Sequence, residues 1–252
     1  MIGGRALALA AGLALASAAT AWADPRLDEV VYSPYVEPRV IEVEARVGQE
    51  LGPGELSGAR TTVVELEAGV SDRASLALVS RITREPGGSD RFTGLGLEGI
   101  YYVGQVPKIG VDVGGYLELA KGFGGDSDGL EAKLLLAKTQ GRFQGLVNLI
   151  LERPLGAPSG QGFASYGYAA SATWRVVGRW RIGAEAFGDL GDDHSFLGRQ
   201  GAYVGPQIKW EGRPGRLPFE VALDAGWLAP VGLDRPEARS QARLSLEIGR
   251  RF

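Results

Sequence analysis

Hydrophobic and polar residues alternate with a period of two in twelve separate segments of this chain. In the last segment, QARLSLEIGRRF, even positions from Ala242 to Ile248 are apolar and odd positions from Gln241 to Glu247 are polar. Such alternation predicts a β-strand with one apolar and one polar face. The twelve predicted strands are Val40–Val47, Thr62–Val70, Leu76–Ile82, Thr93–Val103, Ile109–Leu119, Leu130–Lys138, Phe143–Glu152, Ala164–Arg175, Trp180–Asp189, Ala202–Trp210, Phe219–Leu228 and Gln241–Phe252.

The lengths of the strands and of their connections point to a transmembrane barrel. Each strand is near the roughly 9–11 residues that a tilted strand needs to cross a bilayer. Short connections (SDRAS, GQVPK, TQGR, RVVGR) follow even-numbered strands, EGRPGR is intermediate, and longer ones rich in Gly, Pro and Asp follow odd-numbered strands. We therefore predict an all-β fold, an antiparallel up-and-down β-barrel over residues 40–252 with both termini periplasmic. Pro206 interrupts a predicted strand, so we expect a bulge or a shifted register there.

Composition removes several other classes of protein. Beyond the N-terminus, no apolar run approaches the roughly 20 residues of a transmembrane helix, and mean hydropathy is -0.03. The chain has no cysteine, which excludes disulfides, a lipid-modified N-terminal cysteine and zinc–thiolate sites. The net charge of -3 carries no nucleic-acid signature.

The N-terminus predicts export. Residues 1–23 combine a basic start, a short apolar run and an A-x-A site, which is the pattern of a signal peptide cleaved between Ala23 and Asp24. Residues 24–39 form a polar, proline-containing leader. We interpret it as a periplasmic extension that could also fold into the lumen. The expected location is the bacterial outer membrane.

Aromatic residues lie where the outward faces of the predicted strands would meet the edges of a bilayer, as membrane barrels require. They are Tyr101, Phe143, Trp174, Trp180, Trp210, Phe219, Trp227 and Phe252, and all except Trp227 fall at predicted periplasmic ends. The last strand, ending on Phe252, resembles the last strand of Gram-negative outer-membrane β-barrel proteins. That resemblance implies outer-membrane lipid and the barrel-assembly machinery as partners.

Two phrases suggest a narrower resemblance. VVYSPYVE at Val30–Glu37 and VELEAGVSDRASLAL at Val64–Leu78 resemble the outer-membrane barrels related to phenol-degradation meta-pathway transporter-like proteins. The resemblance implies a barrel that passes or binds small, hydrophobic compounds. A soluble periplasmic β protein is the alternative to a membrane barrel, because a soluble barrel also alternates. Twelve strands enclose more volume than side chains readily fill, which favours the membrane barrel.

The polar faces of the strands would line the lumen, and their acids outnumber their bases. The predicted lumen-lining residues are Glu65, Glu67, Arg81, Glu98, Asp112, Glu118, Glu131, Lys133, Glu152, Arg181, Glu185, Lys209, Asp224, Arg243 and Glu247. One interpretation is a water-filled channel for small solutes with a negative field that favours cations or neutral molecules. The other is a non-conducting structural or ligand-binding barrel plugged by salt bridges.

We expect no enzyme activity, no cofactor and no metal. Residues 94–99 fit GxGxxG, but they lie within a strand and open no helix. His194 is the only histidine and neighbours Ser195, yet adjacent residues seldom form a nucleophile–base pair, so we interpret both as solvated loop residues. Residues 126–129 start like a calcium loop but lack its terminal Glu, which indicates a turn.

Overall fold

The computed structural model describes residues 25–54, 56–156, 163–197, 202–215, 217–231 and 240–252. The predicted signal peptide and its cleavage site at Ala23 and Asp24 lie outside the described residues.

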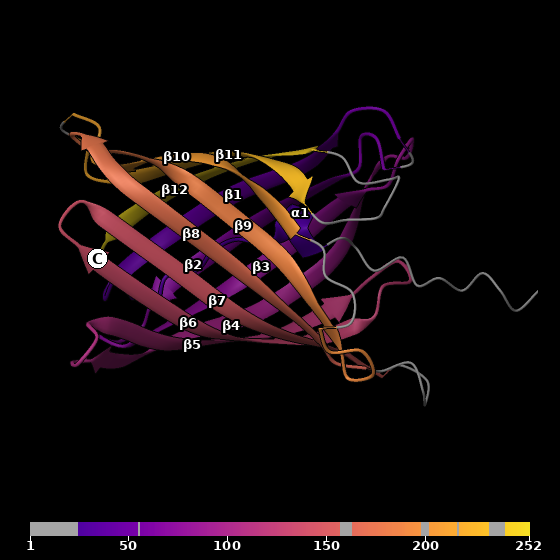
Figure 1. The fold of residues 1–252 in the computed structure, drawn as a ribbon, viewed down its shortest axis with the longest axis horizontal. Coiled ribbons are helices and arrows are strands. Elements are labelled where there is room, and N and C mark those ends of the chain that lie inside the picture. The colour runs from indigo at the N-terminus through magenta and orange to yellow at the C-terminus, as the bar shows by residue number, and fades with distance from the viewer. Residues whose placement is uncertain (1–24, 55, 157–162, 198–201, 216, 232–239) are drawn as a thin grey trace, which may run out of the picture.

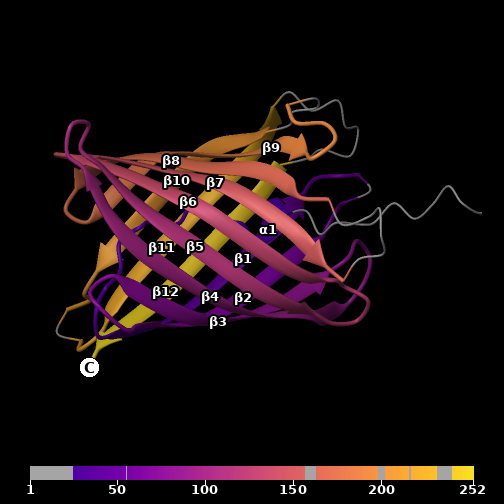
Figure 2. The same cartoon turned by 90° about the horizontal axis from the view of Figure 1, so that it is seen from below.

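The described strands close into one antiparallel barrel, in which each strand pairs with its sequence neighbours and β1 pairs with β12 (Figures 1 and 2). All twelve predicted strands are present. Their bounds are β1 Val40–Leu51, β2 Arg60–Gly69, β3 Ala74–Arg84, β4 Asp90–Val106, β5 Val111–Gly122, β6 Asp128–Gln140, β7 Phe143–Leu155, β8 Ser165–Val177, β9 Trp180–Asp192, β10 Ala202–Gly212, β11 Glu220–Val231 and β12 Ser240–Arg251. Before them lies the short helix α1, Pro25–Asp28.

The barrel has two ends that differ in their connections, which we call the turn end and the loop end. The turn end holds Phe252, the start of β1 and the β2–β3, β4–β5, β6–β7, β8–β9 and β10–β11 connections; the loop end holds the others. Several strands extend beyond the predicted bounds, and β4 reaches 17 residues. The hydrogen-bonded ladder continues there after the apolar alternation has stopped, because backbone pairing does not require an apolar side chain.

The apolar faces of the strands point outward. Leu97 is 53% exposed, and its register partners Leu78 and Leu119 are similarly exposed. Side chains on the inward face are far less exposed: Glu98, next to Leu97, is 2% exposed, and Asn148 of β7 is 0% exposed. A barrel with an apolar outer band and polar buried residues inside has its non-polar surface where a bilayer would cover it.

The prediction of a bulge or shifted register at Pro206 is wrong. On the β11 side the pairing lapses between Val204↔Ala229 and Gln207↔Gly226 and resumes in the same register, while pairing with β9 is continuous. The sheet accommodates the missing proline donor by leaving ladder positions unpaired, so no extra residue is inserted.

Gly205, beside Pro206, is a position where the backbone of β11 comes very close. A Cβ there would collide with the carbonyl oxygen of Trp227, whereas a Cβ on Gly115 in β5 would meet nothing. We expect Gly205→Ala to destabilise the barrel by about 1–3 kcal/mol, the usual effect of overpacking. Gly115→Ala should change it by less than about 0.5 kcal/mol. Urea unfolding of the refolded variants in lipid measures both, and equal stabilities would contradict the close approach.

Candidate functional site

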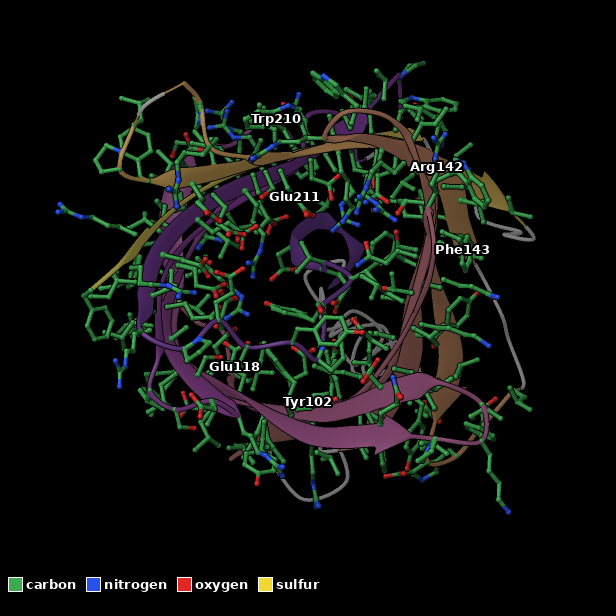
Figure 3. The ribbon with its side chains drawn as sticks, turned by 90° about the vertical axis from the view of Figure 1, so that its left-hand side faces the viewer. Tyr102, Glu118, Arg142, Phe143, Trp210 and Glu211 are labelled. Carbon is green, nitrogen blue, oxygen red and sulfur yellow. The ribbon has the colours of Figure 1, made fainter. Side chains whose placement is uncertain are left out.

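The described part of the leader, residues 25–38, lies inside the barrel. Figure 3 shows α1 and the following chain within the ring of strands. The backbone of Tyr32 is fixed to the wall at Asn148 of β7: its N–H donates to Asn148 Oδ1 at 2.7 Å, and Asn148 Nδ2 donates back to the Tyr32 carbonyl at 2.9 Å. Of the two placements that the sequence allowed, these contacts are those of a leader folded into the lumen.

Glycines on the inner wall make room for the leader. A Cβ on Gly48 of β1 would collide with the carbonyl of Leu27, and one on Gly114 of β5 would collide with Pro34. Where the leader meets β1, Arg39 adopts φ 60°, a left-handed conformation that is unfavourable for a non-glycine residue. This bend reverses the chain, so that the leader and β1 run side by side from the turn end.

Lys133 of β6 is the central ionic contact between wall and leader. Its Nζ lies 2.6 Å from Glu29 of the leader and 2.6 Å from Glu131 of the wall. The ammonium also sits 4.6 Å and 4.7 Å from the ring centroids of Tyr32 and Tyr116. Cation–π contacts of this kind add to ion pairs where water is excluded.

Two arginines repeat this arrangement. Arg46 binds Glu44 and Glu65 of the wall at 2.7 and 2.8 Å and donates to the Tyr32 hydroxyl of the leader at 3.1 Å. Arg81 binds Asp28 of the leader at 2.9 Å and also forms two hydrogen bonds to Glu118 of β5. Each base therefore neutralises a wall carboxylate and holds a leader residue.

The leader tyrosines remain protonated at neutral pH and act as donors. Burial raises the pKa of the Tyr32 hydroxyl well above its usual value. The pKa of Tyr35 rises to about 12 through burial and its hydrogen bond to Asp112, which is 2.8 Å long. The leader is thus attached to the wall from Asp28 near the loop end to Tyr35 near the turn end.

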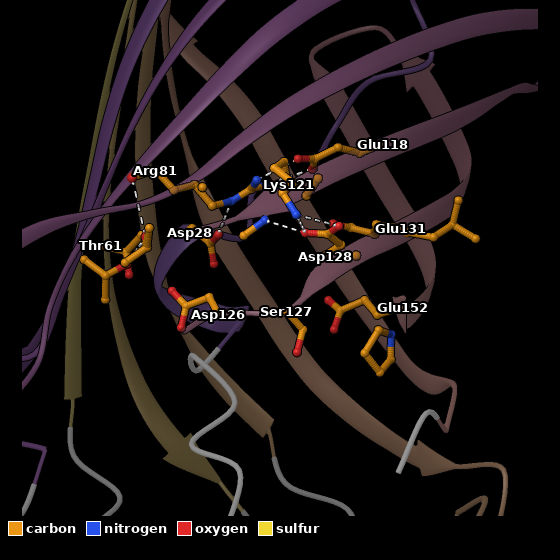
Figure 4. A pocket seen from close by; sticks show the side chains of 18 of the residues that line it. Asp28, Thr61, Arg81, Glu118, Lys121, Asp126, Ser127, Asp128, Glu131 and Glu152 are labelled. Carbon is orange, nitrogen blue, oxygen red and sulfur yellow. Dashed lines mark hydrogen bonds and ion pairs between the residues drawn. The ribbon is translucent and has the colours of Figure 1, made fainter. Parts of the chain in front are cut away.

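The leader leaves two cavities in the lumen. The one toward the loop end has a volume of about 500 Å³ and includes Asp28, Arg81, Glu118 and Lys121 (Figure 4). The other opens toward the turn end and has a volume of about 600 Å³. Tyr32 and Arg46 border both. A solute crossing the barrel would have to pass between the leader and the wall at this point.

The predicted lumen residues divide between these cavities. Arg81, Glu118, Glu131, Lys133 and Glu152 line the loop-end cavity. Glu65, Glu67, Glu185, Lys209, Asp224, Arg243 and Glu247 line the turn-end cavity. Of the remaining three, Glu98 accepts from Tyr116, Asp112 accepts from Tyr35 and Tyr102, and Arg181 donates to Thr173 and to the carbonyl of Arg142.

The predicted interface aromatics lie near the barrel ends. Tyr101, Trp174, Trp180, Trp227 and Phe252 are exposed, and Phe143, Trp210 and Phe219 are half-buried. Neighbouring strands bring them together in pairs, with ring centroids 6.4 Å apart for Phe143 and Trp174 and 6.5 Å apart for Trp180 and Trp210.

The residues that hold the leader were not predicted from the sequence. Asn148 is not among the predicted lumen-lining residues, and Glu29 and Tyr32 were assigned only to a polar extension. The phrase VVYSPYVE, with its apolar and aromatic residues inside an otherwise polar leader, was the available signal. Val31 and Tyr32 pack against buried wall clusters at Phe187 and Tyr116, so this phrase forms part of the core.

The loop around His194 is structured by its own backbone. The Asp192 carboxylate accepts the N–H groups of His194 and Ser195 at 2.8 Å each. The His194 ring packs edge-on against Phe163, with centroids 3.9 Å apart. Within the described part of the chain, no hydrogen bond joins the Ser195 hydroxyl to the imidazole. Asp128, in the segment resembling a calcium loop, instead pairs with Lys121 at 2.8 Å.

Two groups of carboxylates could in principle hold a cation: Glu29, Glu131 and Glu152, and Glu65, Glu67 and Glu98. In each group a side-chain cation is already present. Lys133 binds two members of the first group, and Arg46 binds Glu65 of the second. These contacts give the carboxylates counter-ions from the chain itself.

No protein-family model matches the chain, and no curated protein matches it either. No described helix has the length and apolar character needed to span a membrane.

The fold of the chain is similar to solved structures of outer-membrane barrels. An outer-membrane channel from Pseudomonas putida F1 is 12% identical with a TM-score of 0.60, covering 89% of this chain and 100% of that one. The NanC porin is 8% identical with a TM-score of 0.56, over 83% and 100% of the two chains. The KdgM porin, solved with disordered oligogalacturonate, is 10% identical with a TM-score of 0.50, over 84% and 99%. At such identities the likeness concerns the fold, which is a closed twelve-stranded barrel of the outer-membrane type.

Proposed function

We propose that this chain is an outer-membrane channel for small solutes, closed in the described conformation by its own leader. The apolar outer band supports placement in a bilayer. The observation that carries a transport role is the pair of charged cavities, one toward each end, that meet at Tyr32 and Arg46. A barrel built only for structure would not require two such cavities in line. Proteins of similar fold that are described as channels or porins add support by analogy alone.

The acidic residues of the lumen set the expected selectivity. Glu42, Glu67 and Glu247 line the turn-end cavity, and none of them has an ion pair among the described residues. Carboxylates facing a water-filled path attract cations and repel anions. The channel should therefore pass small cations and neutral solutes in preference to anions. We assign no enzymatic activity and no cofactor to it, and recognition of β12 by the assembly machinery stays a prediction.

The competing function is a non-conducting barrel that is structural or binds a ligand. A specific observation favours it: wall bases hold the leader at Asp28, Glu29 and Tyr32. The two functions differ in whether the leader ever leaves its contacts. A permanent plug gives a silent barrel, while a mobile one gives openings.

Lys133→Met tests this difference. The variant keeps an unbranched side chain that is one atom shorter, but it leaves Glu29, Glu131 and nearby Glu152 without the shared ammonium. Removing one partner of a buried ion pair costs about 3–5 kcal/mol, and about 1.4 kcal/mol is a factor of ten. We expect single-channel recordings in planar bilayers to show rare, cation-selective openings for the wild type. In Lys133→Met the open probability should rise by about a hundredfold or more.

The matched control is Lys138→Met, because Lys138 lies on the same strand but is exposed and points away from the lumen. It should behave like the wild type. Wild-type and Lys133→Met barrels that are folded, heat-modifiable and equally silent would favour the structural function.

A further inference from the structure

The register of the barrel arranges its acidic residues in a continuous row. Glu42 of β1 is the partner of Glu67 in β2, and Glu67 leads through Ala77 to Glu98 in β4. The row continues through direct partners in β5, β6 and β7, namely Glu118, Glu131 and Glu152. We call these six carboxylates the acidic row. Because barrel strands are tilted, the row winds from the turn end at Glu42 to the loop end at Glu152.

A second row carries the opposite charge. Arg175 of β8 is the partner of Arg181 in β9, which is the partner of Lys209 in β10. Through Asp224 and Ser245 the row reaches Arg46 of β1, and through Val63 it reaches Arg81 of β3. We call Arg175, Arg181, Lys209, Arg46 and Arg81 the basic row. On β1 the two rows pass four residues apart, at Glu42 and Arg46.

Neutralisation of the rows is uneven along the barrel. Toward the loop end, Arg81 and Lys133 pair with Glu118 and Glu131 of the acidic row. At the turn end the rows lie on different walls. Glu42 and Glu67, with Glu247 of β12 beside them, form the acidic wall and line the turn-end cavity. We call Arg142, Arg175, Arg179 and Arg181, from the β6–β7 turn to β9, the basic wall, and Arg179 is the member that lines this cavity. Figure 3, viewed from this end, shows oxygens gathered along the indigo strands and nitrogens gathered beside Arg142.

The basic wall has polar contacts, but no ion pair joins its arginines to a carboxylate among the described residues. Arg181 is only 6% exposed, and its guanidinium donates to Thr173 Oγ1 at 2.9 Å and to the Arg142 carbonyl at 3.2 Å, which are neutral acceptors. Glu211 also faces this part of the lumen (Figure 3), yet no ion pair joins it to the four arginines in the described segments. Arg181 lines neither cavity, so its charge acts on a solute through the field of the lumen and not by contact.

We propose that the turn-end cavity binds zwitterionic small solutes, with the carboxylate against Arg179 of the basic wall and the ammonium against the acidic wall. The proposal rests on the channel function and names its substrate class. The cavity of about 600 Å³ is within the range of small-molecule sites. A simple cation is attracted by the acidic wall but gains nothing from Arg179, and a simple anion is attracted by Arg179 but repelled by the acidic wall. A zwitterion gains from both, and solutes with well-separated charges reach both walls best.

Single-channel recording of the full chain tests the proposal with three probes of one length. These are 6-aminohexanoate, hexylamine and hexanoate, added from each side in turn. We expect 6-aminohexanoate to block the current with an apparent Kd at least about tenfold below that of either singly charged probe. About tenfold corresponds to 1.4 kcal/mol, which two solvated charge contacts can supply.

Two variants locate the site. Arg179→Gln should remove the advantage over hexylamine, and Glu247→Gln should remove the advantage over hexanoate. Both residues line the cavity and neither has an ion pair among the described residues, so the barrel should stay folded. Arg73→Gln is the control, because Arg73 is exposed in the β2–β3 turn at the same end and lines neither cavity. Equal block by all three probes in a conducting wild type would overturn the proposal and leave the channel function intact.

If the wild type does not conduct, the channel function fails, and the binding site must be tested without a current. Calorimetric titration of the folded barrel in detergent then measures binding of the same three probes. Selective binding of 6-aminohexanoate that is lost in Glu247→Gln would support the site in a non-conducting barrel. Absence of selective binding would overturn it.

Discussion

Deleting residues 25–37 is expected to raise the single-channel conductance several-fold over that of the full chain. The leader fills the centre of the lumen and separates its two cavities at Tyr32 and Arg46. Its removal joins them into one water-filled path, in which conductance is set by the remaining cross-section and lining charge. Planar-bilayer recordings of both proteins at the same salt concentration measure the change.

The barrel should survive this deletion, because each base that holds the leader keeps a partner on the wall. Lys133 retains Glu131, Arg46 retains Glu44 and Glu65, and Arg81 retains Glu118. Closure by β1 and β12 starts at Val40 and is extended by a hydrogen bond from the Phe252 N–H to the Arg39 carbonyl, both outside the deleted segment. The control is Tyr35→Phe, which removes one hydroxyl contact with Asp112 and should leave conductance almost unchanged. A folded deletion variant that conducts no better than the full chain would show that something other than the leader closes the lumen.

Leu97→Arg is expected to destabilise the barrel by about 2–4 kcal/mol, the effect of a cation on the lipid face near the bilayer midplane. Leu97 lies in the outer apolar band between Leu78 and Leu119, so the guanidinium would enter hydrocarbon. Equilibrium unfolding by urea or guanidinium in lipid vesicles measures the loss.

The matched substitution is Val177→Arg, at the turn end of β8, where Val177 is 68% exposed. Near the bilayer edge an arginine reaches the headgroups, so the cost should fall to about 0–1 kcal/mol. Equal losses at the two positions would mean that the outer apolar face is not buried in lipid at the depth assigned to Leu97.

The strands could be predicted because alternation is local. In segments such as Gln241–Phe252, apolar and polar residues alternate with the period of a strand. All twelve strands were predicted from this alternation. The structure around Pro206 could not be predicted in this way. The sequence indicates that a donor is missing, but whether a sheet responds with a bulge or with unpaired positions depends on the neighbouring strand, here at Trp227.

The candidate site was predictable only in part. The inward parity of residues such as Glu118 and Lys133 follows from the alternation. Their partners do not, because Lys133 meets Glu29 across 104 positions and Tyr32 meets Asn148 across 116. The leader has no period that would reveal its place. The acidic and basic rows could not be predicted from the sequence either, because each row depends on the register of many strand pairs and on every connection between them.

The order in which the chain reaches this state follows from how its ends meet. β1 and β12 join residues from opposite ends of the described barrel, Val40 with Arg251, and contacts of such large sequence separation form slowly. The leader's contacts with β5, β6 and β7 require an inner wall that exists only when those strands are assembled. Leader docking is therefore a late kinetic event, and it can reverse without reopening the β1–β12 seam. The opening of the lumen and the global unfolding of the barrel are accordingly separate barriers, and selection can change the first without weakening the second.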